Sequence, residues 1–258
     1  MPDVERIEVL GVPIGAFTMR TMIARMEELI AQPGCAVAYA VNANALNLTY
    51  HHPDYLEALR LADIVYADGA SILLAAICLG KRLPQRLCTT DVWPQACELA
   101  VTRGYRCFLL GGEPGVADRA KRAALARYPE LRIVGTHHGF FEFGDERVLR
   151  AINAVRPHIL WVGMGDPRQA LWAERVKAQL DAGLVVTCGA MFRFISGDLK
   201  RLPSAWNERG VEWLSRLVQD PRHTWRRYVL GLPLFGARVV AQRLWGHRRA
   251  APRNARSA

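Results

Sequence analysis

Six short apolar segments alternate with longer segments of helical character along most of this chain. The apolar segments are residues 36–41, 63–67, 106–112, 131–135, 158–165 and 184–189. Helical segments such as 116–127 and 146–156 separate them. Strands that are apolar throughout are typical of a parallel sheet covered by helices on both faces. The alternation therefore predicts an α/β fold with a Rossmann-like, mostly parallel sheet.

Positive charge is concentrated at the end of the sequence. Residues 199–258 hold thirteen Lys and Arg residues against three Asp and Glu, which leaves twenty-one of each sign in residues 1–198. The pattern of this last segment is helical only, so we predict a Rossmann-like body over residues 1–198 and a helical, arginine-rich appendage over residues 199–258 with a disordered end. Such a charge asymmetry indicates an anionic partner, which could be a membrane surface, a nucleic acid or a phosphorylated substrate.

The appendage also mixes leucine, phenylalanine, valine and tryptophan with arginine at helical spacing. Such a helix can lie in a lipid interface or pack on the body, and the sequence leaves both open. The six cysteines are scattered, without the spacing of a zinc site, which favours reduced thiols in a cytosolic protein. No secretory signal and no stretch of about 20 apolar residues is visible, so we expect a soluble or peripheral protein.

Polar residues and glycines follow several of the expected strands, at the edge where ligands bind in a parallel sheet. Asp68 precedes Gly69, and the pair is either a turn or a carboxylate that faces a site. Gly111 and Gly112 open a helix, which favours either a bound phosphate or close strand-to-helix packing. Gln169 either closes a capping bond with an N-cap at Asp166 or contacts a sugar or diphosphate.

Eight segments, in one order, resemble the successive motifs of the WecG/TagA/CpsF glycosyltransferases, family 26. They are VNANALNL, ADGASILLAA, LPQRLCTTDVWPQ, FLLGGEPGVA, GTHHGFF, ILWVGMGDPRQALW, GAMFRFISGDLKRLP and GVEWLSRLVQDPRHTWRRYVLGLPLF, within residues 8–236. The resemblance implies an inverting transferase that moves a sugar from a UDP-sugar to a polyprenyl-diphosphate-linked acceptor. It also implies that this enzyme acts at the cytoplasmic face of the membrane, in the assembly of surface polysaccharides.

The resemblance assigns roles to individual residues. Asp68 matches the catalytic base, because inversion needs a carboxylate that takes the acceptor proton. Asn42 and Asn44 match a polar pair that lines the pocket, with N-capping of a helix as the alternative. Arg86 matches a clamp on the diphosphate. The residues expected to bind substrate are Asn42, Asn44, Arg86, Gly111, Gly112, Gln169, Arg216, Arg222, Arg226 and Arg227.

Two departures from the family pattern flank Gln169, since Arg168 replaces a lysine and Ala170 replaces a glutamate. The lost glutamate puts the donor sugar in doubt, so UDP-glucose, UDP-N-acetylmannosamine and its uronic acid stay open, with the first two slightly favoured. No Asp-x-Asp pair is present to tie a metal to a nucleotide diphosphate, and the adjacent His137 and His138 are poor ligands. We therefore predict a metal-independent enzyme without a cofactor.

Two other classes of protein fit parts of the pattern. A dinucleotide-binding oxidoreductase would share the Rossmann-like sheet, but no complete Gly-x-Gly-x-x-Gly follows the first strand. A nucleic-acid-binding protein would explain the basic appendage, but it would not need the acid, amide and glycine loops of the body. We therefore expect a UDP-sugar, a lipid-linked acceptor and an anionic membrane surface as partners, and no nucleic acid. Self-association is left open.

Overall fold

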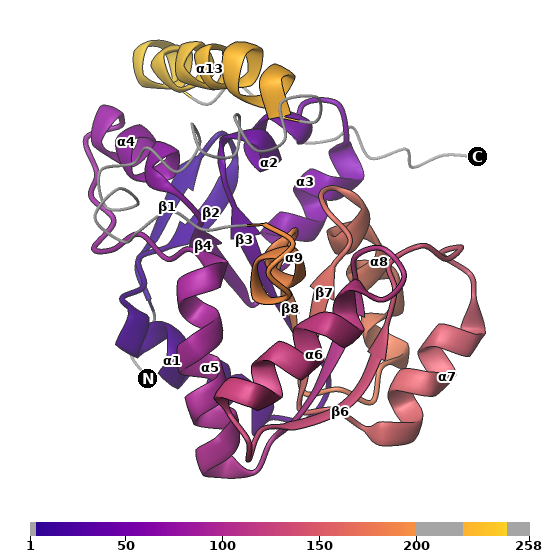
Figure 1. The fold of residues 1–258 in the computed structure, drawn as a ribbon. Helices are drawn as coiled ribbons and strands as arrows, with labels where there is room; N and C mark the ends of the chain where they lie inside the picture. Colours follow the sequence, from indigo (N-terminus) through magenta and orange to yellow (C-terminus); the bar gives the residue numbers. More distant parts are fainter. Residues whose placement is uncertain (1–3, 200–223, 247–258) are drawn as a thin grey trace, which may run out of the picture.

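The computed structural model describes residues 4–199 and 224–246, and its centre is a six-stranded sheet (Figure 1). The strands are β3 (Ala36–Val41), β4 (Ile64–Ala67), β5 (Arg106–Gly111), β6 (Arg132–His137), β7 (Ile159–Gly163) and β8 (Leu184–Thr187). Their order across the sheet is β4-β3-β8-β7-β5-β6, and every neighbouring pair is parallel. The predicted α/β sheet is confirmed, with strand ends that shift by one or two residues.

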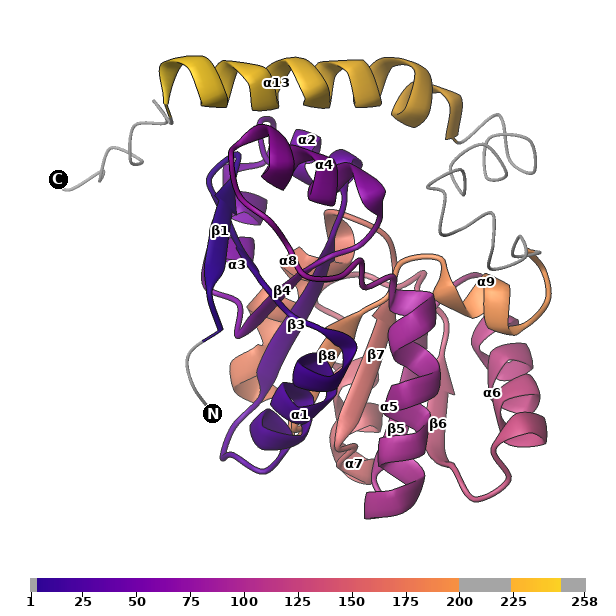
Figure 2. The same cartoon turned by 90° about the vertical axis from the view of Figure 1, so that its left-hand side faces the viewer.

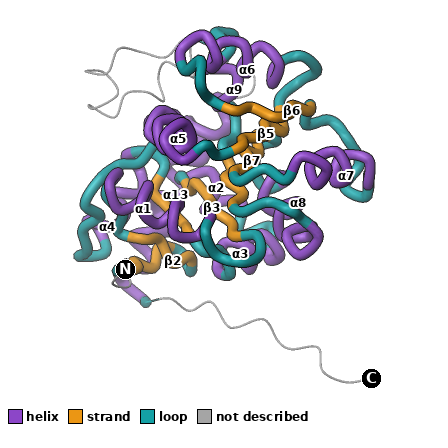
Figure 3. Tube along the Cα trace, turned by 90° about the horizontal axis from the view of Figure 1, so that it is seen from below, coloured by secondary structure: helices purple, strands orange, loops and turns teal. Residues whose placement is uncertain are grey.

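Helices cover both faces of the sheet, as Figure 3 shows for α1, α5 and α6 on one side and α3, α7 and α8 on the other. The first layer consists of α1 (Met19–Ile30), α5 (Thr89–Arg103), α6 (Val116–Arg127) and α9 (Met191–Ile195). The second consists of α2 (Ala43–Leu48), α3 (Pro53–Arg60), α7 (Glu146–Val155) and α8 (Arg168–Val176), which continues as the 3₁₀ turn η1 (Lys177–Gln179).

Successive residues of a strand enter different cores, because side chains alternate between the two faces of a sheet. In β3, Tyr39 packs in the second layer's core, whereas Ala38 and Ala40 pack in the first. Both faces are therefore buried, which is the physical reason for the continuous apolar runs in the sequence.

A hairpin at the start of the chain was missed by the sequence analysis. Strands β1 (Arg6–Val9) and β2 (Val12–Gly15) pair antiparallel. The turn between them places Leu10 at φ 51° and Gly11 at φ 82°. Leucine is uncommon in this left-handed region, so only Gly11 of the two turn residues carries a usual turn signal. The hairpin contributes Ile7, Val9, Val12 and Ile14 to the second layer's core.

The described part of the C-terminal segment lies across the carboxyl end of the sheet (Figure 2). It begins with a π-helical turn, η2 (Arg226–Leu230), and continues as α13 (Gly231–Trp245). This helix contacts α2 and also α4 (Ala70–Cys78), which follows β4. Its side chains Phe235 and Val239 are buried. Of the two arrangements left open by the sequence, packing on the body is the one seen for this face of α13.

Polar contacts reinforce the position of α13. The side-chain amide of Asn47 donates to the Gly231 carbonyl at 2.7 Å, and Arg238 donates to the Asn47 side-chain oxygen at 2.7 Å. The Arg238 guanidinium also lies 3.5 Å from the ring centre of Tyr50. At the other end, the Leu10 amide donates to the side chain of Gln242 at 2.8 Å. Within residues 4–199 and 224–246, no helix is long and apolar enough to cross a membrane.

Candidate active site

A cavity of about 490 Å³ lies at the carboxyl ends of β3 and β4, under α13. It gathers the predicted catalytic base, Asp68, and four of the residues expected to bind substrate: Asn42, Asn44, Arg86 and Arg227. These residues come from four separate loops and helix ends, so only the folded chain brings them together. We refer to this space as the first cavity.

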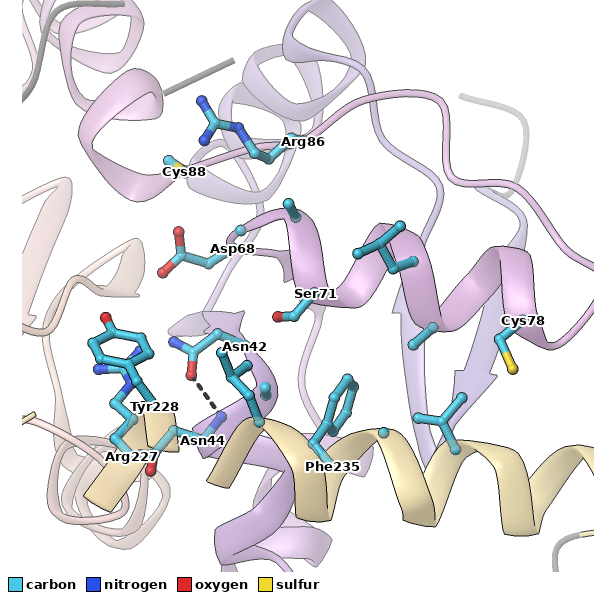
Figure 4. A pocket seen from close by; sticks show the side chains of 18 of the residues that line it. Asn42, Asn44, Asp68, Ser71, Cys78, Arg86, Cys88, Arg227, Tyr228 and Phe235 are labelled. Carbon is cyan, nitrogen blue, oxygen red and sulfur yellow. Dashed lines mark hydrogen bonds between the residues drawn. The ribbon is translucent and has the colours of Figure 1, made fainter. Parts of the chain in front are cut away.

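Asp68 is held at the edge of the first cavity by the backbone on both sides of it. Its own N–H donates to the Val41 carbonyl at 2.8 Å, and the Leu87 N–H donates to the Ala67 carbonyl at 3.0 Å. Gly69 takes the turn into α4 with φ 104°, in the region that favours glycine. Asp68 is half-buried, and its carboxylate points into the cavity (Figure 4). The glycine therefore makes the turn, and the aspartate faces the site.

Asn42 combines a structural role with a place in the cavity wall. Its side-chain oxygen accepts from the N–H groups of Asn44 and Ala45 at 3.1 and 3.2 Å, so it caps α2. The capping alternative is thus correct for Asn42. Its amide nitrogen is turned toward the side of the cavity where Asp68 and Tyr228 lie (Figure 4). Asn44 also lines the cavity but does not cap the helix.

The cavity holds two arginines from distant parts of the sequence. Arg86 lies in the loop before α5, and its guanidinium is 3.7 Å from the Asp91 carboxylate. Arg227 reaches the cavity from η2. Arg226 is exposed, lies over the ring of Trp225 at 5.4 Å and does not line the first cavity. Arg216 and Arg222 lie outside the described residues.

A second cavity, of about 1140 Å³, lies at the carboxyl ends of β5 and β7. Gly112 lines it, but its N–H donates to the Gly163 carbonyl at 3.0 Å, so this glycine supplies room and not a donor for phosphate. Gly111 lines neither cavity. It is buried against Gly163, where a Cβ atom would lie 2.3 Å from the carbonyl oxygen. Close strand packing therefore accounts for Gly111.

His137 and His138 line the second cavity, with ring centres 4.4 Å apart. Across residues 4–199 and 224–246, no three His, Cys, Asp or Glu side chains are grouped so that they could hold a metal ion. Arg168 braces the loop beside these histidines, because it donates to the Phe141 carbonyl and lies 4.8 Å from the ring centre of Phe143.

Gln169 and Asp166 lie in the turn between β7 and α8. The Gln169 side chain donates to Asp166 at 3.0 Å and accepts from the Gly189 N–H at 3.1 Å, and the residue is 2% exposed. Gln169 therefore ties two strand-end loops together, and its predicted contact with substrate stays a prediction. The N-cap of α8 is Pro167 and not Asp166 as expected, because the helix begins one residue later, at Arg168.

The pKa of the Asp166 carboxyl group is affected by charges in the first cavity. Burial raises its pKa above the ordinary value, and the hydrogen bond from Gln169 opposes this shift. The charge of Arg227 lowers the same pKa, whereas that of Asp68 raises it. Ala170 is fully buried, and its carbonyl accepts from the Tyr39 hydroxyl at 3.3 Å. The replacement at Ala170 therefore lies in the core and lines neither cavity.

Comparison with known proteins gives one family. The model of the "Glycosyl transferase WecG/TagA/CpsF family" matches residues 7–249. Similar curated proteins are the N-acetylglucosaminyldiphosphoundecaprenol N-acetyl-beta-D-mannosaminyltransferases of Staphylococcus aureus strains MW2 and COL. Each is 27% identical over 239 residues, which cover 91% of this chain and 92% of the relative.

Proposed function

Because this chain belongs to the WecG/TagA/CpsF glycosyltransferase family, we propose that it moves a sugar from a UDP-sugar to a polyprenyl-diphosphate-linked saccharide, with inversion at the sugar carbon. The observation that carries the proposal is the Asp68 carboxylate, which faces a cavity shared with Arg86 and Arg227. A base beside two cations suits a reaction in which a hydroxyl loses its proton and a diphosphate gains charge. The reaction contributes to the synthesis of a cell-surface polysaccharide.

Asp68 takes the proton of the acceptor hydroxyl as its oxygen bonds to the anomeric carbon of the donor. The bond from that carbon to the UDP oxygen breaks at the same time, on the opposite face of the sugar, and UDP leaves with the electron pair. Arg86 and Arg227 stabilise negative charge on phosphate oxygens, which guanidinium groups bind in a bidentate manner. These two cations take the place of a metal ion in the proposed mechanism.

We place the nucleotide of the donor in the second cavity. The strand ends that border it are rich in glycine, with Gly112, Gly163, Gly165 and Gly189 in its wall. Residues without a side chain leave room for a ligand to approach the backbone closely. The relatives named above transfer N-acetylmannosamine to an N-acetylglucosaminyl diphosphoundecaprenol. UDP-N-acetylmannosamine and that acceptor are therefore the first pair to test.

Because the proposed acceptor is a lipid, the enzyme must act at a membrane surface. The outer side of the C-terminal helix suits contact with such a surface. Leu234, Leu244 and Trp245 of α13 are all exposed, with Trp245 at 71%, and none of them lines the first cavity. Exposed Arg243 adds positive charge to the same helix. An amphipathic helix of this kind binds the interface of anionic lipid, at the inner face of the cell membrane in this proposal.

The test is UDP release from a panel of UDP-sugars, with and without the lipid-linked acceptor and with and without EDTA. We expect acceptor-dependent release that persists in EDTA and falls by about 10²- to 10⁴-fold in Asp68→Asn, the usual contribution of a general base. Asp181→Asn is the matched control, because Asp181 is exposed and lines neither cavity. Unchanged turnover in Asp68→Asn would remove the base from the mechanism, and release abolished by EDTA would remove metal independence.

A further inference from the structure

We propose that the first cavity continues as a groove for the isoprenyl chain of the acceptor, with α4 as one wall and α13 as the other. The proposal rests on the function proposed above and adds to it a binding site for the lipid itself. It starts from the uneven chemistry of the cavity, whose polar side chains lie at one end and whose apolar side chains lie at the other.

The polar end is formed by Asp68, Arg86 and Arg227, where the head group reacts. From there α4 and α13 run side by side, and Cys78 marks the far end of α4 (Figure 4). The walls between these ends include Leu74 of α4 and Val240 of α13. At 1.5 Å per residue, the nine residues of α4 give a groove about 13 Å long, enough for the first isoprenyl units of a chain.

The apolar walls of the groove are exposed. Leu74 is 65% exposed and Val240 is 47% exposed, although the neighbouring Phe235 and Val239 are buried and hold α13 in place. Apolar side chains that line a cavity gain stability when an apolar ligand removes them from water. The groove also has room, because a Cβ atom placed on Gly236 would meet no other atom within 4 Å.

Two features identify the occupant as a prenyl diphosphate. The two cations at the polar end, which stabilise the charge that UDP gains, also attract the diphosphate of the acceptor, and the chain attached to that diphosphate has an apolar path that leads away from Asp68. The path ends at the exposed Cys78 and Val240. The next residues outward include exposed Ile77 of α4 and Leu244 of α13, and Leu244 belongs to the surface proposed to meet the membrane. An acceptor could therefore keep most of its chain in the bilayer while its first units lie between the two helices.

Gly236→Leu tests the groove directly, because it places an apolar side chain in the open space without requiring a strained backbone. Leucine also favours a helix over glycine, so α13 should be retained. Ala237→Leu is the matched control, since Ala237 is exposed and does not line the cavity. The readout is the ratio of kcat/KM for a long polyprenyl acceptor over one with a single isoprenyl unit.

We expect a ratio of at least about tenfold in the wild type, since burial of each methylene improves affinity by roughly fourfold. The ratio should fall toward one in Gly236→Leu and keep its wild-type value in Ala237→Leu. A wild type that does not distinguish the two chains would overturn the groove while leaving the transferase in place. If neither acceptor were turned over, the proposed function would fail, and the groove would be decided by a binding experiment that needs no catalysis.

That experiment uses Cys78 as a probe in the full chain. Cys78 lines the groove and is exposed, whereas the other five cysteines are buried or half-buried. Farnesyl diphosphate should slow alkylation of Cys78 by a small maleimide several-fold, and Gly236→Leu should remove this protection. Inorganic diphosphate and farnesol each lack half of the ligand and should protect less. Equal protection by either one, or none by farnesyl diphosphate, would contradict the proposal.

Discussion

Truncation of Phe235 should release α13 from the body. Phe235 is 4% exposed and lies between α13 and the helices beneath it. Removal of a buried phenylalanine side chain costs about 3–5 kcal/mol. We take the lower end, because α13 covers this site from one side and keeps its hydrogen bonds with Asn47 and Leu10. A loss of about 3 kcal/mol raises the undocked population roughly a hundredfold.

Hydrogen exchange measured by mass spectrometry on residues 231–245 is the assay. An isolated helix of this length is marginal in water, so its amides exchange when α13 leaves the body. Phe235→Ala should speed this exchange roughly a hundredfold while peptides of the sheet keep wild-type rates. Leu234→Ala is the matched control, because Leu234 is 45% exposed. Equal exchange in the two variants would show that burial of Phe235 does not hold the helix.

Three further predictions concern the sites beneath α13. Gly111→Ala should lower the free energy of unfolding in urea by about 3 kcal/mol, because the new Cβ lies 2.3 Å from the Gly163 carbonyl oxygen. Gly144→Ala is the control: its Cβ meets no atom within 4 Å, so the free energy of unfolding should change by less than about 0.5 kcal/mol. Arg86→Lys keeps the charge but loses the bidentate geometry, so kcat/KM for the transfer should fall about tenfold with an unchanged circular dichroism spectrum. Burial raises the pKa of Asp166, so the folded state binds the carboxyl proton more tightly than the unfolded state does. The contribution of Asp166 to the free energy of unfolding therefore falls as pH rises through and above the unfolded pKa of about 4. Asp166→Asn removes that loss. The free energy of unfolding in urea, variant minus wild type, should therefore rise between pH 4 and pH 7.

The sheet could be predicted from local pattern because its strands are buried on both faces. The run in β3 is apolar at every position for this reason, and the prediction of residues 36–41 matches its bounds. Helix α6 was also predicted with its observed bounds, Val116–Arg127. The hairpin of β1 and β2 was not predicted, because each strand has only four residues and the turn places Leu10 in a left-handed conformation. Only tertiary packing of Ile7 and Ile14 offsets such a local preference.

The amino-acid sequence by itself determined the fold class, the family and the candidate residues of the site, Asp68 and Arg86 among them, because motifs and apolar runs are local properties. It did not show that Gly111 serves strand packing or that Gln169 joins two loops, since these depend on neighbours distant in the chain. Nor did it show that α13 closes the space beside α4. That cavity exists because long-range packing of Phe235 brings a separate segment over the end of the sheet.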